Sequence, residues 1–487
     1  MNSIFRHRNA DVERLFNAAG RPDKVMCVAL DYAKRDHTVA VCDGSGRRLR
    51  SAFNVRNNRE GLDFLIGVVE GLCRKHKIER GHVFFGGEDC GRYAFNFIYA
   101  LASKGFLVVG INAGDAKHER DCSSASTDAI DAVGVAGMMI KKAGRTIGAT
   151  FNDAYVIRRL RHQRDALVRA QSASAHRLHS LVDELFPGFL DTKLSGLTPF
   201  GRASLWLMEE RFSAAEVHAR KRPALVKALR DFAVVDPDGA ADKLRALADA
   251  GLPAPERMIP VYQRCLRDEL ALYRGLGESV HAMDADIAKA LARTPGAMLA
   301  TIPGIGTRWA AALYSELADP LRRRRVDSMS ALAGIVPRVK QTGGKDGPTV
   351  VGRRTKQCNP FLKSALVSAA VSVSQYGHAE MRESFRADEA QGRDARMRMA
   401  RRLLRLCLCL ADNGAFFLPP SLHKGGATDA VREYYAQVWP KVLIKWRDSG
   451  AILEAVAEGS PLKTWHDMAE ELYGLELSVK SPQYVRK

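Results

Sequence analysis

The sequence contains little cysteine and no long run of apolar residues. Its nine cysteines are spread over 487 residues without a Cys-x-x-Cys pair, which is typical of free thiols in a reducing compartment and excludes a disulfide-rich secreted scaffold. No apolar stretch is long enough to span a bilayer, and the first 23 residues are polar and basic without a secretory signal. These absences predict a cytoplasmic protein that is not embedded in a membrane.

Acidic residues are scarce relative to basic ones. The chain has 55 Asp and Glu against 74 Lys and Arg, which gives a formal net charge of +19 and a pI of about 9.6. Its length allows about two to four domains with real cores. Because the positive excess is large in a chain of ordinary apolar content, we expect a folded protein that binds polyanions. The alternative is a soluble basic protein without such a partner.

Residues 24–148 carry a regular succession of predicted strands and helices. Three strand-like segments come first and are separated by turn residues, so we expect an antiparallel meander. Helical and strand periodicities then alternate. The expected strands are 25–31, 38–42, 48–55, 82–85 and 106–111, and the expected helices are 59–76, 92–103 and 128–142. This order predicts an α/β ribonuclease-H-like domain, whose parallel half has buried apolar strands.

Four acidic residues stand at or near the ends of these elements. Asp31 closes the first strand and Glu88 follows the fourth, while Asp128 and Asp131 are three apart on one helix and share a face. Hard oxygen ligands of this kind suit Mg²⁺ or Mn²⁺, and two such ions can clamp the oxygens of a phosphodiester. Taken singly, each acid is better explained as a cap or turn residue. Because all four occur in this order of elements, we favour a metal site.

Helical patterns fill residues 150–295, which we predict to be a helical or coiled-coil linker. Residues 153–186 combine leucines spaced by three, four and seven with arginines between them. Such a helix can form a coiled coil with a second chain, bind nucleic-acid phosphates, or pack on its own domain. The polar residues 112–126 predict a loop beside the metal site, which either closes on substrate or only connects two elements.

Residues 299–308 contain the sequence Ile-Pro-Gly-Ile-Gly between two helical stretches. Two glycines in a tight turn between helices indicate a helix-hairpin-helix, whose amides and following helix N-terminus can hold a DNA phosphate. Arg308 stands directly after the turn, and residues 322–325 are four consecutive arginines. We expect both to contact phosphates, although such a turn also occurs for structural reasons alone.

A second basic turn follows this block. Thr342 begins the sequence Thr-Gly-Gly-Lys and lies between Lys340 and Lys345. A hydroxyl exposed on such a turn can attack a phosphodiester and form a covalent intermediate, but on chemistry alone a β-turn in a basic loop is the simpler explanation. The further basic residues that we expect to hold phosphates are Arg353, Arg354 and Lys356.

These motifs together resemble a known family. The four acids, with the motif Thr-Asp-x-x-Asp-Ala, are similar to the N-terminal domain of the DEDD-type insertion-sequence transposases, which include the pilin-gene invertases. The Ile-Pro-Gly-Ile-Gly block, Ala-Gly-Ile-Val-Pro, Thr-Gly-Gly-Lys and Lys-x-x-Asn resemble their C-terminal transposase domain. The resemblance covers residues 24–148 and 299–375. It implies a site-specific DNA recombinase in which the metal domain and a C-terminal nucleophile form composite sites across a multimer.

The sequence departs from the family's pattern in two places. The family has a catalytic serine followed by glycine where this chain has Thr342. Threonine keeps the hydroxyl, but its β-methyl stiffens χ1 and crowds attack. Either the threonine is the nucleophile, or the register differs, or the nucleophile is degenerate. In the Lys-x-x-Asn motif, a glycine of the family has become Cys358.

The sequence therefore predicts a transposase that cleaves and rejoins DNA of an insertion sequence. The predicted catalytic residues are Asp31, Glu88, Asp128, Asp131 and Thr342, with Mg²⁺ or Mn²⁺ at the four acids. The predicted regions are a metal domain at 24–148, a helical linker at 150–295, a mainly α transposase domain at 296–377 and a basic helical extension at 378–487.

The resemblance also carries expectations about partners and location. It implies DNA as partner, a homo-oligomer that is a dimer or tetramer, and a bacterial, nucleoid-associated protein in the cytoplasm. Some members of the family are guided by a structured bridge RNA, so RNA guidance is a further expectation. Two other functions fit the same residues. One is a metal-dependent nuclease or junction resolvase without a covalent intermediate, and the other is a nucleic-acid-binding protein without catalysis.

Overall fold

The structure is a computed structural model of the chain. It describes residues 8–88, 93–112, 116–117, 128–147, 153–209, 212–318, 325–341, 349–354, 358–423 and 428–474. These residues form two compact units, one with the residues up to 147 and one with those from 153 onward, and each is described by itself. Within these ranges, no helix has both the length and the apolar character that crossing a bilayer requires.

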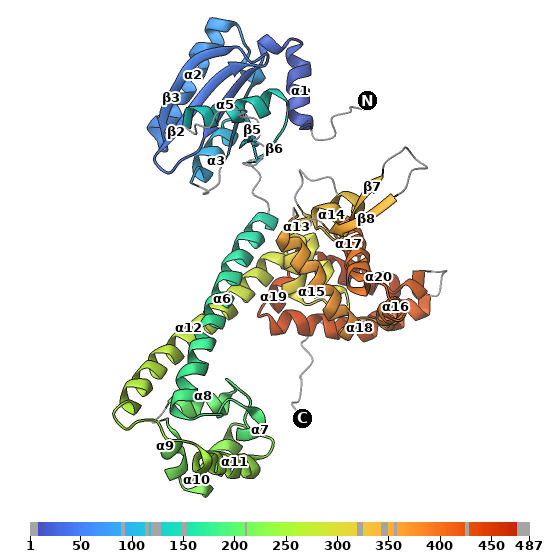
Figure 1. Cartoon of the computed structure of the whole chain (residues 1–487). Helices are drawn as coiled ribbons and strands as arrows, with labels where there is room; N and C mark the ends of the chain where they lie inside the picture. The colour runs from blue at the N-terminus through green and yellow to red at the C-terminus, as the bar shows by residue number, and fades with distance from the viewer. Residues whose placement is uncertain are drawn as a thin grey trace. The chain divides into compact units, whose positions relative to one another are not determined.

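The first unit is built on a six-stranded sheet of order β3-β2-β1-β4-β5-β6 (Figure 1). Its strands are β1 (Met26–Asp31), β2 (Asp36–Asp43), β3 (Arg48–Arg56), β4 (Val83–Glu88), β5 (Leu107–Gly110) and β6 (Arg145–Thr146). The first three strands are antiparallel neighbours, whereas β4 and β5 run parallel to β1. This topology confirms the predicted meander and the ribonuclease-H-like layout; the short edge strand β6 was not predicted.

Helices pack on both faces of this sheet. They are α1 (Ala10–Ala19), α2 (Arg59–His76), α3 (Phe95–Ser103) and α5 (Asp128–Ile140). Because successive strand residues point to opposite faces, Val28 and Leu30 of β1 pack with α2 and α3, while Cys27 and Ala29 pack with α1 and α5. The helix α1 was not predicted, although its buried residues Val12, Leu15 and Phe16 have helical spacing.

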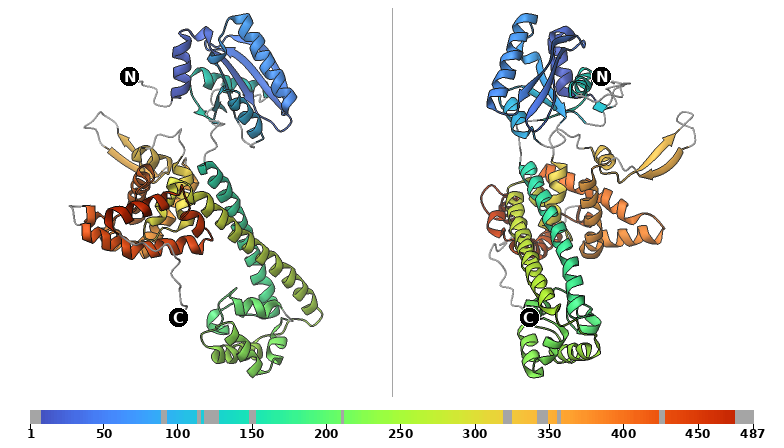
Figure 2. Two further views of the ribbon diagram at one scale, coloured as in Figure 1. Left: turned by 180° about the vertical axis from the view of Figure 1, so that it is seen from behind. Right: turned by 60° about the vertical axis from the view of Figure 1, so that its left-hand side comes forward.

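Two long helices organise the second unit. The helix α6 (Asp153–Leu185) lies alongside α12 (Ile259–Ala292), as Figures 1 and 2 both show. Ion pairs from Arg164 to Asp284 and from Arg177 to Glu269 set an antiparallel register between them. The apolar seam predicted for residues 153–186 therefore packs against a helix of the same chain, as one of the three alternatives proposed.

A small helical lobe lies between these two helices in the sequence. It contains α7 (Thr192–Ser195), α8 (Arg202–Glu209), α9 (Ala214–Ala219), α10 (Arg222–Asp231) and α11 (Pro237–Ala250). Its separate hydrophobic cluster includes the mutually packed rings of Phe186, Phe189 and Phe212. The stretch predicted as a helical linker therefore contains a lobe with a hydrophobic cluster of its own.

The rest of the second unit forms around one large hydrophobic cluster. Its elements are η3 (Pro295–Thr301), α13 (Thr307–Leu317), α14 (Val326–Leu332), α15 (Pro360–Tyr376), α16 (Ala379–Ala390), α17 (Ala395–Asn413), η4 (Pro420–His423), α18 (Thr428–Asp448), α19 (Ile452–Ala455) and α20 (Pro461–Tyr473). Trp439, Trp446 and Trp465 from the C-terminal part share this cluster with Leu299 and Leu313. The described part of the basic extension, residues 378–423 and 428–474, therefore contributes to the core around the predicted hairpin motif.

Two local features complete this unit. The first helix of the predicted helix-hairpin-helix is the 3₁₀ helix η3, which starts at the Thr294 cap and runs into the Pro-Gly turn. The strands β7 (Pro337–Gln341) and β8 (Thr349–Arg354) pair antiparallel on either side of the basic turn.

Candidate metal and nucleic-acid sites

Asp31 and Glu88 end two neighbouring strands of the first unit. The parallel pairing of β1 and β4 sets Asp31 directly opposite Glu88, so their Cα atoms are separated by about one strand spacing, roughly 4.8 Å. By alternation, both residues are on the sheet face that α5 covers, since Ala29 and Phe84 are in the cluster on that face. Both side chains are half-buried.

Asp128 and Asp131 lie in the first turn of α5, which packs on that same face. The buried stripe of α5 is formed by Ala132, Val135 and Met139. Spacings of three and four residues place both acids at the N-terminal end of this stripe. Asp131 is half-buried and Asp128 is exposed.

The direction of α5 brings all four acids to one end of the sheet. At the C-terminal end of α5, Ile140 Cδ1 would lie 3.6 Å from a Cβ at Gly46, in the turn beside the start of β1. At the same end of the helix, a Cβ at Gly86 would meet Met139 Sδ at 2.5 Å, so glycine allows α5 to pack closely on β4. The first turn of α5 therefore lies toward the strand ends that carry Asp31 and Glu88.

The donor set fits a hard divalent cation, since it consists of carboxylate oxygens only. In the part of the chain that the structure describes, however, no three of these acids have ligand oxygens within 4.8 Å of one another. Oxygens bound to one Mg²⁺ are at most about 4.2 Å apart. For these acids to bind one ion together, their side chains would therefore have to rotate while the backbone keeps its position.

A different group of potential ligands occurs on α20. His466, Asp467 and Glu470 are the one trio among the described residues with ligand atoms this close together. Burial lowers the pKa of His466, whose ring stacks on Trp439, and Asp467 is already paired with Lys463. Ring stacking and ion pairing therefore account for the closeness of these three side chains on α20.

The turn before α13 has the geometry expected of a hairpin motif. Gly304 has φ +85°, and a Cβ there would lie 3.1 Å from both Val373 Cα and the Gly377 amide nitrogen, so only glycine fits. Gly306 is the N-cap of α13, and no side chain caps this helix. Its first-turn amides are therefore not capped by the protein's own side chains, and they suit an anion.

Lys445 on α18 holds the carbonyl side of the same turn. Its Nζ donates hydrogen bonds to the carbonyl oxygens of Ala300, Ile302 and Ile305, at 2.6, 3.0 and 2.7 Å. Burial lowers the pKa of Lys445 to about 7, while the three acceptors favour its charged form. Sequence analysis missed this residue, because nothing in the pattern links position 445 to a turn 140 residues earlier.

The buried carboxylate of Glu316 connects three helices, α6, α13 and α15. Glu316 on α13 accepts a hydrogen bond from Arg161 Nη2 at 3.0 Å and one from Asn359 Nδ2 at 2.8 Å. The Oδ1 atom of Asn359 also caps α15 by accepting from the amides of Phe361 and Leu362. The asparagine of the Lys-x-x-Asn motif therefore positions α15 against α13.

The remaining predicted residues lie on α13, on the hairpin of β7 and β8, or outside the described residues. Arg308 is the second residue of α13 and is exposed. Lys340 is in β7, and Arg353 and Arg354 are in β8, so hairpin pairing places them on adjacent strands. The predicted residues Thr342, Lys345 and Lys356 lie outside the described residues, as do residues 322–324 and most of the predicted loop 112–126.

Two family models match the chain in the order that the motifs predict. Residues 28–187 match the DEDD transposase model of the IS110 family, and residues 296–386 match a model described as transposase of the IS116/IS110/IS902 family. Together they cover just over half of the chain. The chain belongs to the IS110 family of transposases. As a transposase it is an enzyme that acts on DNA. No curated protein matches the chain in a direct sequence comparison.

Proposed function

We propose that this transposase cuts and rejoins DNA strands with a divalent metal at Asp31, Glu88, Asp128 and Asp131. The observation that carries the proposal is the in-register pair Asp31–Glu88, on the sheet face that α5 covers. Two Mg²⁺ or Mn²⁺ ions, when bound, would stabilise the attacking and leaving oxygens of the phosphodiester. The role of the four acids is to hold these ions, which in turn would hold the phosphate of the reacting strand.

The proposed nucleophile is the hydroxyl of Thr342, which stands at the family's serine position. In the proposed step, Thr342 Oγ loses its proton and forms a bond to phosphorus, while the bond from phosphorus to a sugar oxygen breaks. The released sugar oxygen takes up a proton, so the number of phosphodiester bonds is unchanged. Reversal of this step with a different strand end would rejoin the DNA.

Phosphate contacts near this step are proposed for the basic residues of the second unit. Arg308 stands at the uncapped start of α13, and the hairpin strands carry Lys340, Arg353 and Arg354. Lys345 and Lys356 complete the proposed set from the sequence alone. Because guanidinium and ammonium groups replace counterions on the phosphate backbone, binding should weaken steeply with salt.

Two finer points are also proposed. Guidance by a structured RNA is compatible with the large positive charge of the chain. A dimer or tetramer would allow the metal domain of one copy to act with the nucleophile of another. Both follow from the family resemblance.

The metal-site proposal is tested by the substitution Asp31→Asn in the full chain. We expect DNA cleavage with Mg²⁺ to fall at least about a hundredfold, because a ligand is lost, while DNA affinity is retained. The matched control is Asp63→Asn, an exposed acid on α2 on the opposite face of the sheet. Cleavage by Asp31→Asn at the level of this control would contradict the proposal.

A further inference from the structure

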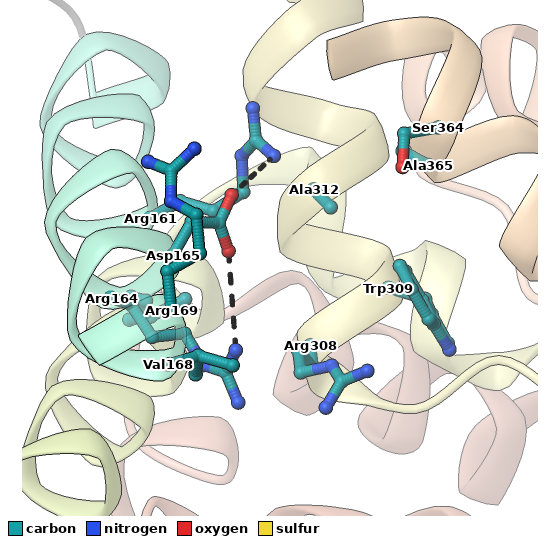
Figure 3. Close-up of a pocket in the computed structure, with 11 residues that line it drawn as sticks. Arg161, Arg164, Asp165, Val168, Arg169, Arg308, Trp309, Ala312, Ser364 and Ala365 are labelled. Atoms are coloured by element: carbon teal, nitrogen blue, oxygen red, sulfur yellow. Dashed lines mark hydrogen bonds and ion pairs between the residues drawn. The ribbon is translucent and has the colours of Figure 1, made fainter. Parts of the chain in front are cut away.

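A basic pocket lies in the second unit, where α6, α13 and α15 meet. Its volume is about 280 Å³, at the lower end of pockets that enclose small ligands. Figure 3 shows arginines of α6 on one side and Arg308 and Trp309 of α13 on the other. The polar and aromatic residues of its wall are Arg161, Arg164, Asp165, Arg169, Arg308, Trp309 and Ser364.

Two of these arginines are held by the protein. Arg161 is buried and pairs with Glu316, and Arg164 is buried and pairs with Asp284, with N–O distances of 3.0 Å in both cases. Asp165 lies between them and accepts further contacts from both, drawn as dashed lines in Figure 3. These ion pairs hold Arg161 and Arg164 in place in the wall of the pocket. They do not neutralise the other two arginines of the wall.

The other two arginines are available to a ligand. Arg169 and Arg308 are both exposed, and neither forms an ion pair with a carboxylate among the residues that the structure describes. Partial burial and the positive charge of Arg164 lower the pKa of Arg308. A bound anion would relieve this repulsion between neighbouring cations. In addition, Arg161 Nε is buried without a hydrogen-bond partner.

Trp309 in the wall of the pocket indicates which kind of anion the pocket can bind. The Arg308 guanidinium lies over the Trp309 ring, 4.7 Å from its centroid, and both are flat groups on which a nucleobase can stack. The uncapped amides at the start of α13 lie beside them. A pocket of this volume can hold a phosphate with one base but has no room for a duplex. This combination of arginines and a flat aromatic surface is typical of single-strand recognition.

We infer that this pocket binds one phosphodiester of a single-stranded nucleic acid, with the adjoining base against Arg308 and Trp309. Arg169 and Arg308 would approach the phosphate from opposite walls. The inference rests on the proposed function, because a transposase that exchanges strands must hold unpaired nucleotides. It adds a site that the metal domain does not contain.

The test compares the full chain with the variants Arg169→Gln and Arg308→Gln. Binding of labelled single-stranded DNA and RNA of the same sequence is measured over a range of salt concentrations. Each variant should lose about tenfold in affinity, as for hydrogen bonds to charged groups, and its salt slope should fall by about 0.7 for one lost phosphate contact. The matched control is Arg267→Gln, an exposed arginine on α12 outside the pocket, which should bind like wild type.

A second measurement locates the base directly. A single strand that carries 5-bromouracil is photo-crosslinked to the protein, and mass spectrometry identifies the attached peptide. We expect a crosslink at Trp309 that weakens in Arg308→Gln and persists in Arg267→Gln. A crosslink found only elsewhere would overturn the placement of the base.

The outcomes separate this inference from the proposed function. If both pocket variants bind single strands as Arg267→Gln does, the pocket inference is wrong even when DNA recombination proceeds. An equal loss of affinity for duplex DNA in Arg169→Gln, a residue with no other proposed DNA contact, would contradict single-strand recognition. If the wild type does not cleave DNA but the pocket variants bind single strands more weakly, the proposed function is wrong and the pocket inference is supported. Tighter binding of the single-stranded DNA or of the RNA shows which of the two nucleic acids the pocket prefers.

Discussion

In the first unit, the candidate metal ligands lie on elements whose arrangement follows from the order of strands. Asp31 and Glu88 are neighbours because β1 and β4 pair in parallel, and α5 adds its acids from the face it covers. In the second unit, the candidate nucleic-acid surface depends on contacts between distant segments: Lys445 with the hairpin turn, and Arg161 with Glu316. The first site depends on sheet register, whereas the second depends on long-range polar contacts.

The two units should therefore respond differently to mutation. A change in the long-range contacts should alter the second unit while leaving the sheet of the first unit intact. Hydrogen exchange, resolved by peptide, can report on both units in the same sample.

The largest effect on stability is expected for Glu316→Ala. This change leaves the buried guanidinium of Arg161 without its main partner and removes the anchor of Asn359. Breaking a buried ion pair from one side costs about 3–5 kcal/mol. We expect a lower thermal midpoint and faster exchange in α13 and α15, with unchanged exchange in β1.

The control for this prediction is Glu278→Ala, since Glu278 is exposed on α12. Similar exchange in Glu316→Ala and in this control would show that α13 and α15 do not depend on the buried carboxylate. Faster exchange in β1 would show that the two units do not unfold independently.

A smaller effect is expected for Lys445→Met. Methionine keeps most of the side-chain volume but leaves three carbonyls of the hairpin turn without their donor. An unsatisfied buried acceptor costs about 1–3 kcal/mol. We expect faster exchange in residues 300–306 and weaker DNA binding, since the turn that presents the amides of α13 is loosened.

Lys441→Met serves as the matched control, because Lys441 is exposed on the same helix α18. If both variants bind DNA equally well, Lys445 does not position the turn. If Lys445→Met instead loses all of its second-unit structure, Lys445→Arg offers a milder change that keeps the charge.

The sequence was sufficient to predict most of the first unit. Alternation of apolar residues and turn chemistry located strands β1 to β5 to within a few residues, and the helix spacing placed Asp128 and Asp131 on one face. The helix α1 and the strand β6 were missed, because each is short and is stabilised by contacts across the fold. Asn9, for example, caps α1 and also bonds to Thr146 of β6.

The second unit was less predictable for a physical reason. Periodicity gives the length of α6 and its apolar face, but it does not say which helix covers that face. The sequence does not predict a function for residues 378–487, because the role of Lys445 depends on a tertiary contact with residues 300–305. The family motifs located the turn and Asn359, whereas only the structure revealed their partners, which are Lys445 for the turn and Glu316 for Asn359.

The most direct test of the central claim is a search for a covalent protein–DNA adduct. Full-length protein with its co-purifying RNA is incubated with Mg²⁺ and DNA that spans the element's end and an insertion site, and the products are separated on a denaturing gel. We expect an adduct for wild type and for the control Thr349→Ala, and none for Thr342→Ala or Asp31→Asn. Cleavage without an adduct, equal in wild type and Thr342→Ala, would contradict the account and identify a hydrolytic nuclease.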